Sequence, residues 1–163
     1  APFECPWGGE SFQWFELTSI APEKIGEGLK VAGPYLNFYI DSVCKNYNLA
    51  NDKIFFVSFS QGTMMALYHL CKRKYKCGGL VGFSGLLFED ESFDNDVISK
   101  FPITLYHGKN DEVINYEFTL KAHEKLSNLG FEINYNLSDL LGHGIDEKGL
   151  SIGESFIKKY FYI

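Results

Sequence analysis

The chain has 163 residues, the size of one globular domain, and 45% of them are hydrophobic, which is enough to form a buried core. Its formal net charge is −6 and Arg73 is its only arginine. These features argue against a nucleic-acid partner, because phosphate recognition relies on clustered basic side chains. No apolar run reaches the roughly 18 to 20 residues that a membrane span needs, so no transmembrane segment is expected.

The chain has four cysteines, Cys5, Cys44, Cys71 and Cys77. No two of them have Cys-x-x-Cys spacing, and no two histidines have zinc-finger spacing. We therefore expect no structural metal site. A core of this size does not need disulfide staples, so we expect reduced, mostly buried thiols in a cytoplasmic protein. The chain does not open on a charged stretch followed by an apolar one, so we expect no signal segment. Residues 1–6 resemble an internal loop, so we expect the chain to be a fragment of a longer protein.

The first half of the chain is predicted to run from a loop through a long helix into a buried strand. Prolines and glycines punctuate residues 1–20, which we interpret as loop. Residues 22–47 have helical periodicity, and Pro34 among them predicts a kink or two separate helices. Residues 53–59 are apolar without alternation, which is typical of a strand covered on both faces. Helical periodicity returns over residues 63–76.

In the second half of the chain, two short apolar strands and a third strand, whose apolar and polar residues alternate, are interleaved with helices. An acidic loop, which we interpret as solvated, separates the first two of these strands. The strands are predicted over residues 78–83, 102–107 and 131–137, the loop over 84–100, and the helices over 115–129 and 148–160. This alternation predicts an α/β fold, with a mostly parallel sheet flanked by helices on both faces. We expect residues 1–163 to form a single domain.

The pentapeptide at residues 58–62, Ser-Phe-Ser-Gln-Gly, lies where a predicted strand gives way to a helix. A sharp turn in this position lifts the hydroxyl of Ser60 above the sheet edge. The backbone N–H of Gln61 then faces the same space, where it can bind an oxyanion. Ser58 stands where such turns usually have a first glycine. Ser60 is therefore the candidate nucleophile, and the alternative is an ordinary Ser/Gly turn before a helix.

A serine hydroxyl needs a base, and the base needs an orienting acid. On this kind of fold they follow the serine in the order acid, then histidine, each after a strand. Asp111 lies four residues past the third predicted strand, and His143 follows the fourth between two glycines. Both positions lie just beyond strand ends, where sites form in open α/β sheets. The sequence thus predicts that Ser60, Asp111 and His143 act together.

Five other residues compete for these two roles. His69 and His123 fall within predicted helices, and His107 precedes a turn, where a structural hydrogen bond is the preferred interpretation. Asp146 precedes the last helix, which favours a helix-capping role. Asp139 is too close in sequence to the candidate base to come from a separate strand end.

Three separated motifs resemble the phospholipase/carboxylesterase family of α/β-hydrolases, which includes the acyl-protein thioesterases. They are residues 59–67 (Phe-Ser-Gln-Gly-Thr-Met-Met-Ala-Leu), 107–113 (His-Gly-Lys-Asn-Asp-Glu-Val) and 142–146 (Gly-His-Gly-Ile-Asp). The resemblance runs essentially end to end and is stronger to bacterial members than to animal thioesterases. It implies that Ser60, Asp111 and His143 hydrolyse small-molecule or lipid esters or thioesters without a cofactor or metal. Trp14 and Met64 are the candidate substrate-binding residues, although Met64 also suits core filling.

One departure from the family leaves alternatives open. Family members carry an earlier strand that ends in a His-Gly-rich loop, which supplies a second oxyanion N–H. Neither this strand nor this loop is found in these 163 residues. The alternatives are a catalytically impaired remnant, or a peptidase on the same fold. A flavodoxin-like binding domain would need a glycine-rich loop after the first strand, which we do not find. Without the earlier strand, residues 53–59 are expected to form an exposed edge through which the chain self-associates.

Overall fold

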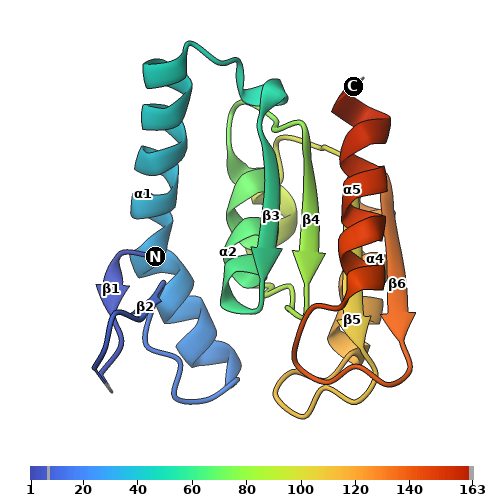
Figure 1. Ribbon diagram of the computed structural model, residues 1–163. Helices are drawn as coiled ribbons and strands as arrows, with labels where there is room; N and C mark the ends of the chain where they lie inside the picture. The colour runs from blue at the N-terminus through green and yellow to red at the C-terminus, as the bar shows by residue number, and fades with distance from the viewer. Residues whose placement is uncertain (7, 162–163) are drawn as a thin grey trace. The chain divides into compact units, whose positions relative to one another are not determined.

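A computed structural model describes residues 1–6 and 8–161 and divides the chain into two compact units, Ala1–Leu49 and Ala50–Ile163 (Figure 1). That the two units form the single domain expected from the sequence stays a prediction. Within the described residues, none of the helices combines the length and the hydropathy needed to span a membrane.

The first unit contains a two-stranded hairpin and one long helix. Strands β1 (Phe3–Glu4) and β2 (Phe12–Gln13) pair antiparallel, so the prediction of loop throughout residues 1–20 was wrong for these four residues. Helix α1 (Pro22–Tyr47) is continuous, and Pro34 does not divide it into two. Its buried apolar side chains recur every three or four residues, and their packing offsets the backbone hydrogen bond that Pro34 cannot donate.

The second unit is built on a four-stranded parallel sheet, which confirms the predicted α/β class. The strands stand in the order β3 (Phe55–Phe59), β4 (Gly79–Phe83), β5 (Ile103–Gly108) and β6 (Ile133–Ser138). The helices are α2 (Gln61–His69), α3 (Phe93–Asp96), α4 (Glu117–Asn128) and α5 (Glu147–Phe161), with 3₁₀ turns at Asn51–Lys53 and Leu70–Lys72. Helix α2 is thus shorter than the predicted helix over residues 63–76.

Alternate side chains of the central strands pack against helices on opposite faces of the sheet. On one face, a Cβ added to Gly153 of α5 would lie 3.1 Å from a methyl of Val81 in β4. On the other, a Cβ added to Gly82 would lie 2.8 Å from the methyl of Thr63 in α2. Figure 1 shows α5 in front of the sheet and α4 behind it. The predicted helices on both faces are confirmed.

Strand β3, which leads into the candidate nucleophile, lies at an edge of this sheet. Among the described residues it pairs with β4 alone. Val57 is 61% exposed and Phe59 38% exposed, whereas every residue of β4 is buried. The sequence-based prediction that residues 53–59 are covered on both faces was therefore wrong in the described structure, whereas the expectation of an edge strand is confirmed there.

The acidic segment after β4 is held by ion pairs, so it is more than the solvated loop that its composition predicts. Lys125 of α4 lies 2.7 Å from a carboxylate oxygen of Asp94 and 3.0 Å from one of Glu89. Lys72 lies 3.0 Å from a carboxylate oxygen of Asp96. These contacts fix the segment, including the short helix α3, against the helices that follow β3 and β5.

The four cysteines are free thiols, as expected from the sequence, but Cys5 and Cys44 are only partly buried. Cys71 and Cys77 are buried, and burial raises the pKa of each thiol to about 12. These two thiols therefore stay protonated near neutral pH and act as apolar core side chains.

Candidate active site

Ser60 occupies the sharp turn that the sequence predicts between β3 and α2. Its backbone has φ 51° and ψ −117°, a conformation that residues with a Cβ rarely adopt. The Ser60 N–H donates to the Phe83 carbonyl at the end of β4 (2.9 Å), and the Ser60 carbonyl accepts from the Thr63 N–H (2.9 Å). The turn is thus held from both the sheet and the helix, with the hydroxyl at the carboxyl edge of the sheet.

The turn requires α2 to approach the sheet closely, and Thr63 lies at the point of contact. A Cβ added to Gly85 would lie 2.4 Å from the Thr63 Cβ, so only glycine fits there. The Thr63 hydroxyl donates to the Phe83 carbonyl (2.9 Å), and it lies 3.1 Å from the Ser58 hydroxyl. Ser58, which stands in place of the usual first glycine, is therefore accommodated by hydrogen bonding.

His143, in the loop between β6 and α5, links the serine to a carboxylate. Its Nε2 lies 3.0 Å from the Ser60 Oγ, and its Nδ1 lies 2.8 Å from Asp111 Oδ2. Since an ionised carboxylate only accepts, Nδ1 carries the proton and Nε2 is left to accept from the Ser60 hydroxyl. The imidazole also lies against the Phe59 ring, with 4.9 Å between centroids, and is 20% exposed.

The Asp111 carboxylate is fully buried and is surrounded by donors. Its Oδ1 accepts from the backbone N–H groups of Val113 (2.9 Å) and Ile114 (2.8 Å). Burial alone would raise the pKa of Asp111, but the bonds from Ile114, His143 and Val113 outweigh it and lower that pKa below the ordinary value. The carboxylate therefore stays ionised near neutral pH, as an acid that orients an imidazole must.

The loops that carry Asp111 and His143 lie side by side, which brings together two residues 32 positions apart. The Asn110 N–H donates to the Leu141 carbonyl at 3.0 Å. Gly108 permits this approach, because a Cβ there would lie 2.1 Å from the same carbonyl oxygen. The predicted acid and base thus meet where the ends of β5 and β6 adjoin.

Three further predicted residues lie in different surroundings. Gln61 begins α2, and N–H groups in the first turn of a helix point out of its N-terminal end, here beside Ser60. Met64 lies in α2 and is fully buried. Trp14 lies in the first unit directly after β2 and is partly buried. The oxyanion-binding role of Gln61 and the substrate-binding roles of Met64 and Trp14 stay predictions.

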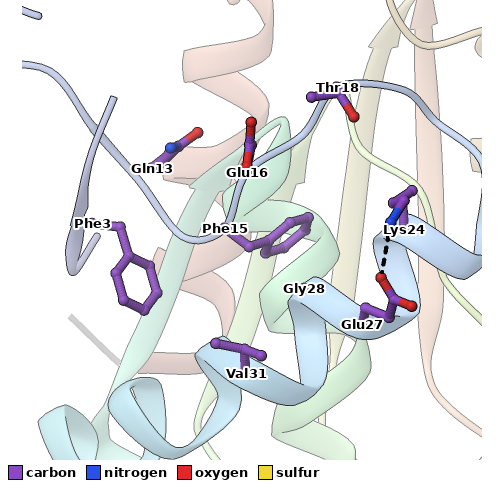
Figure 2. A pocket seen from close by; sticks show the side chains of 9 residues that line it. All are labelled: Phe3, Gln13, Phe15, Glu16, Thr18, Lys24, Glu27, Gly28 and Val31. Carbon is purple, nitrogen blue, oxygen red and sulfur yellow. Dashed lines mark hydrogen bonds and ion pairs between the residues drawn. The ribbon is translucent and has the colours of Figure 1, made fainter. Parts of the chain in front are cut away.

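The first unit contains a pocket of about 450 Å³, and its lining residues include the two sequence neighbours of Trp14 (Figure 2). The pocket is lined by Phe3, Gln13, Phe15, Glu16, Thr18, Lys24, Glu27, Gly28 and Val31. Figure 2 shows the exposed ion pair between Lys24 and Glu27 at 3.2 Å, which holds two of the polar side chains against each other. Phe15 is the buried member of the set, and it packs where Gly28 of α1 has no side chain.

The competing acids have structural partners. Asp146 Oδ1 accepts from the Gly149 N–H in the first turn of α5 (2.7 Å), so the capping role predicted for Asp146 is confirmed. Its Oδ2 accepts from the Tyr106 hydroxyl (3.0 Å). Asp139 is mostly exposed and pairs with Lys109 at 2.6 Å. Neither carboxylate occupies the place that Asp111 has beside the imidazole.

One residue at the site was missed as a partner by sequence reasoning. His107 has the structural hydrogen bonds that were expected, but its Nε2 also lies 3.1 Å from Asp111 Oδ2, the oxygen that faces His143. The only signal in the sequence was the four-residue spacing between His107 and Asp111. That spacing brings two side chains together only when the intervening loop turns back on the strand end, which a sequence does not show.

A serine in a strained strand-to-helix turn, linked through an imidazole to a buried carboxylate at the edge of a parallel sheet, is the arrangement of the α/β-hydrolases. Within that class, the chain belongs to the phospholipase/carboxylesterase family, whose model matches residues 1–161. The family resemblance drawn from the three motifs is thereby confirmed.

Individual relatives agree with this assignment. The chain is 29% identical over 151 residues to acyl-protein thioesterase 1 of Debaryomyces hansenii, covering 88% of this chain and 65% of that protein. For acyl-protein thioesterase 1 of Gibberella zeae the identity is 24% over 158 residues, covering 90% and 67%. The chain thus spans about two thirds of the length of these curated relatives.

Solved structures show the same fold. The crystal structure of esterase PE8 matches with a TM-score of 0.93 and 28% identity, over 98% of this chain and 75% of that one. The carboxylesterase of Bacillus cereus matches with a TM-score of 0.75 over 94% and 73% of the two chains. Its identity of 16% makes this second likeness one of fold alone.

Proposed function

We propose that the chain carries the nucleophile, base and acid of a serine carboxylesterase that hydrolyses carboxylic esters or thioesters. The observation that supports this most is the unbroken series of hydrogen bonds from the Ser60 Oγ through both nitrogens of His143 to Asp111, at 3.0 and 2.8 Å. A surface serine without such partners has no base to take its proton. Family membership supports the same reaction class.

In the proposed reaction, the Ser60 Oγ attacks the carbonyl carbon of the ester while His143 Nε2 takes the hydroxyl proton. Asp111 stabilises the resulting imidazolium through the bond to Nδ1. The backbone N–H of Gln61 stabilises the tetrahedral oxyanion. His143 then gives the proton to the leaving alkoxide or thiolate. The alcohol or thiol departs, and the acyl group stays bonded to the Ser60 Oγ. A water molecule then attacks the acyl carbonyl carbon while His143 takes its proton. The bond between that carbon and the Ser60 Oγ breaks, His143 returns the proton to the Oγ, and the carboxylic acid leaves.

The substrate class we propose is a small-molecule or lipid ester or thioester, with Trp14 and Met64 contributing to its binding. Acyl-protein thioesterases among the relatives support the thioester part of this class. The four free thiols support a cytoplasmic location for the reaction.

A catalytically impaired protein is the second candidate. In this alternative the oxyanion hole has the Gln61 N–H but no second donor. An oxyanion hole needs more than one donor, and removing one donor costs roughly 10² to 10³ in kcat. A protein with this deficit still acylates at Ser60, but slowly, so the two candidates differ in rate rather than in the site of reaction.

Labelling with a fluorophosphonate tests the proposal. The reagent should modify Ser60, as mapped by mass spectrometry, and Ser60→Ala should abolish both labelling and ester hydrolysis. Ser58→Gly is the matched control, because it removes a neighbouring hydroxyl and restores the glycine usual in such turns. Labelling of an active sample at another serine would contradict the assignment. Product analysis on a panel of esters, thioesters and peptides separates an esterase from a peptidase.

A further inference from the structure

His107 is a second histidine at the site, and it is fully buried near the end of β5. Three polar groups surround its ring. Nε2 lies 3.1 Å from Asp111 Oδ2 and 2.9 Å from the Ile114 carbonyl oxygen. Nδ1 lies 2.7 Å from the Thr119 hydroxyl of α4. Both nitrogens are therefore engaged, one by the loop that carries Asp111 and the other by the helix that follows it.

These partners determine the protonation of the ring. The Ile114 carbonyl and an ionised carboxylate are both acceptors only. The proton of the neutral ring therefore sits on Nε2. Nδ1 is then an acceptor for the Thr119 hydroxyl, which is itself buried. Burial also lowers the pKa of His107 below its ordinary value. The side chain is thus a neutral imidazole near neutral pH, and its one N–H is shared between the Ile114 carbonyl oxygen and Asp111 Oδ2.

The consequence for Asp111 is that each of its oxygens receives two donors. Oδ1 is held by the N–H groups of Val113 and Ile114, and Oδ2 by the two imidazoles. The backbone donors alone would hold one oxygen and leave the plane of the carboxylate free to turn. The two imidazoles together remove that freedom, and His107, which is fully buried, keeps Oδ2 directed at His143.

We propose that His107 is a positioning residue for this site, whose Nε2–H orients the Asp111 carboxylate and thereby sets the tautomer of His143. The inference rests on the proposed function of Ser60, His143 and Asp111. The competing interpretation is that His107 only ties β5 to the neighbouring loop and helix through Ile114 and Thr119. A tie of that kind affects stability, but it does not select a tautomer of His143.

Two substitutions at His107 separate these interpretations. His107→Phe keeps a planar ring of similar size and removes both nitrogens. His107→Gln keeps an N–H at about the distance of Nε2. Losing a hydrogen bond to a charged group should lower kcat roughly 10- to 100-fold in His107→Phe, with KM little changed. His107→Gln should recover most of the loss. His123→Gln is the matched control, because that histidine of α4 packs against Tyr135, and it should behave as wild type.

The ¹⁵N resonances of His143 supply a readout that does not depend on turnover. In wild type and in His107→Gln they should report the single tautomer with the proton on Nδ1, and in His107→Phe a mixture of both tautomers. A folded His107→Phe protein with the wild-type tautomer and kcat would overturn the inference. Should neither His107 variant fold, Thr119→Val replaces them. It should lower kcat a few-fold with KM unchanged, and a wild-type kcat would again overturn the inference.

The two proposals fail in different ways. If Ser60→Ala keeps full esterase activity, the proposed function is wrong. The comparison of His143 tautomers among the His107 variants still decides whether His107 orients Asp111.

Discussion

Replacing Asp111 by asparagine tests how the carboxylate directs the imidazole. The Val113 and Ile114 N–H groups belong to the backbone and cannot reverse, so the oxygen of the introduced amide stays with them. The amide NH₂ then faces His143 Nδ1, where the carboxylate oxygen stands at 2.8 Å in the native protein. Since two donors cannot bond, His143 must move its proton to Nε2.

The loss expected from this change is large. With its proton on Nε2, His143 presents a donor to the Ser60 hydroxyl, 3.0 Å away, and cannot take its proton. A wrong tautomer of this kind lowers kcat on the order of 10⁴ in the Ser-His-Asp proteases. At about 1.36 kcal/mol for each factor of ten, that corresponds to about 5 kcal/mol of lost transition-state stabilisation. Substrate binding does not involve the buried carboxylate, so KM should change little.

The assay is steady-state hydrolysis of a chromogenic ester, together with the rate of fluorophosphonate labelling at Ser60. Asp146→Asn is the matched control, because it makes the same substitution at the carboxylate that caps α5. It should lower the melting temperature and leave kcat close to the wild-type value. Near-normal turnover in Asp111→Asn combined with an inactive Asp146→Asn would contradict the assignment of Asp111 and make Asp146 the acid.

Three further predictions concern stability, assembly and the close contact of the two loops. Folding lowers the pKa of His107 below the value of about 6.5 that it has in the unfolded chain. Its contribution to the free energy of unfolding is therefore fully present above about pH 6.5 and declines as the pH falls toward the pKa of the folded protein. Urea unfolding should therefore show stability falling from pH 7 to 5, with a smaller slope in His107→Gln; equal slopes would contradict this. The exposed edge of β3 should make the chain self-associate, and Val57→Lys should favour the monomer in size-exclusion chromatography with light scattering. A stable wild-type monomer of about 18.6 kDa with full esterase activity would disprove it. Gly108→Ala should lower both kcat and the melting temperature, because its Cβ would lie 2.1 Å from the Leu141 carbonyl oxygen and push the two loops apart. Wild-type values of both would show that the loops can shift without cost.

Most of the architecture was predictable because it follows from local patterns. Apolar runs bounded by turns marked three strands of the parallel sheet, and alternation of apolar and polar residues marked the fourth. The chain order of Ser60, Asp111 and His143 matched the order that their positions after strands require. The capping role of Asp146 was predictable for the same reason, since a cap acts within one turn of its own helix.

Local patterns of residues were thus enough to infer the class of fold, the family motifs and the residues of the proposed chemistry, because each depends on neighbours in the chain. The surroundings of those residues, in contrast, depend on how the elements pack. The apolar run at residues 53–59 suits a buried strand, yet β3 is an edge in the described structure because burial depends on which strands stand beside it. The contact of His107 with Asp111 likewise depends on how the loop folds back on the end of β5 and on the Thr119 hydroxyl of α4. Burial and hydrogen-bond geometry depend on contacts between segments far apart in the sequence, so they cannot be predicted from local periodicity.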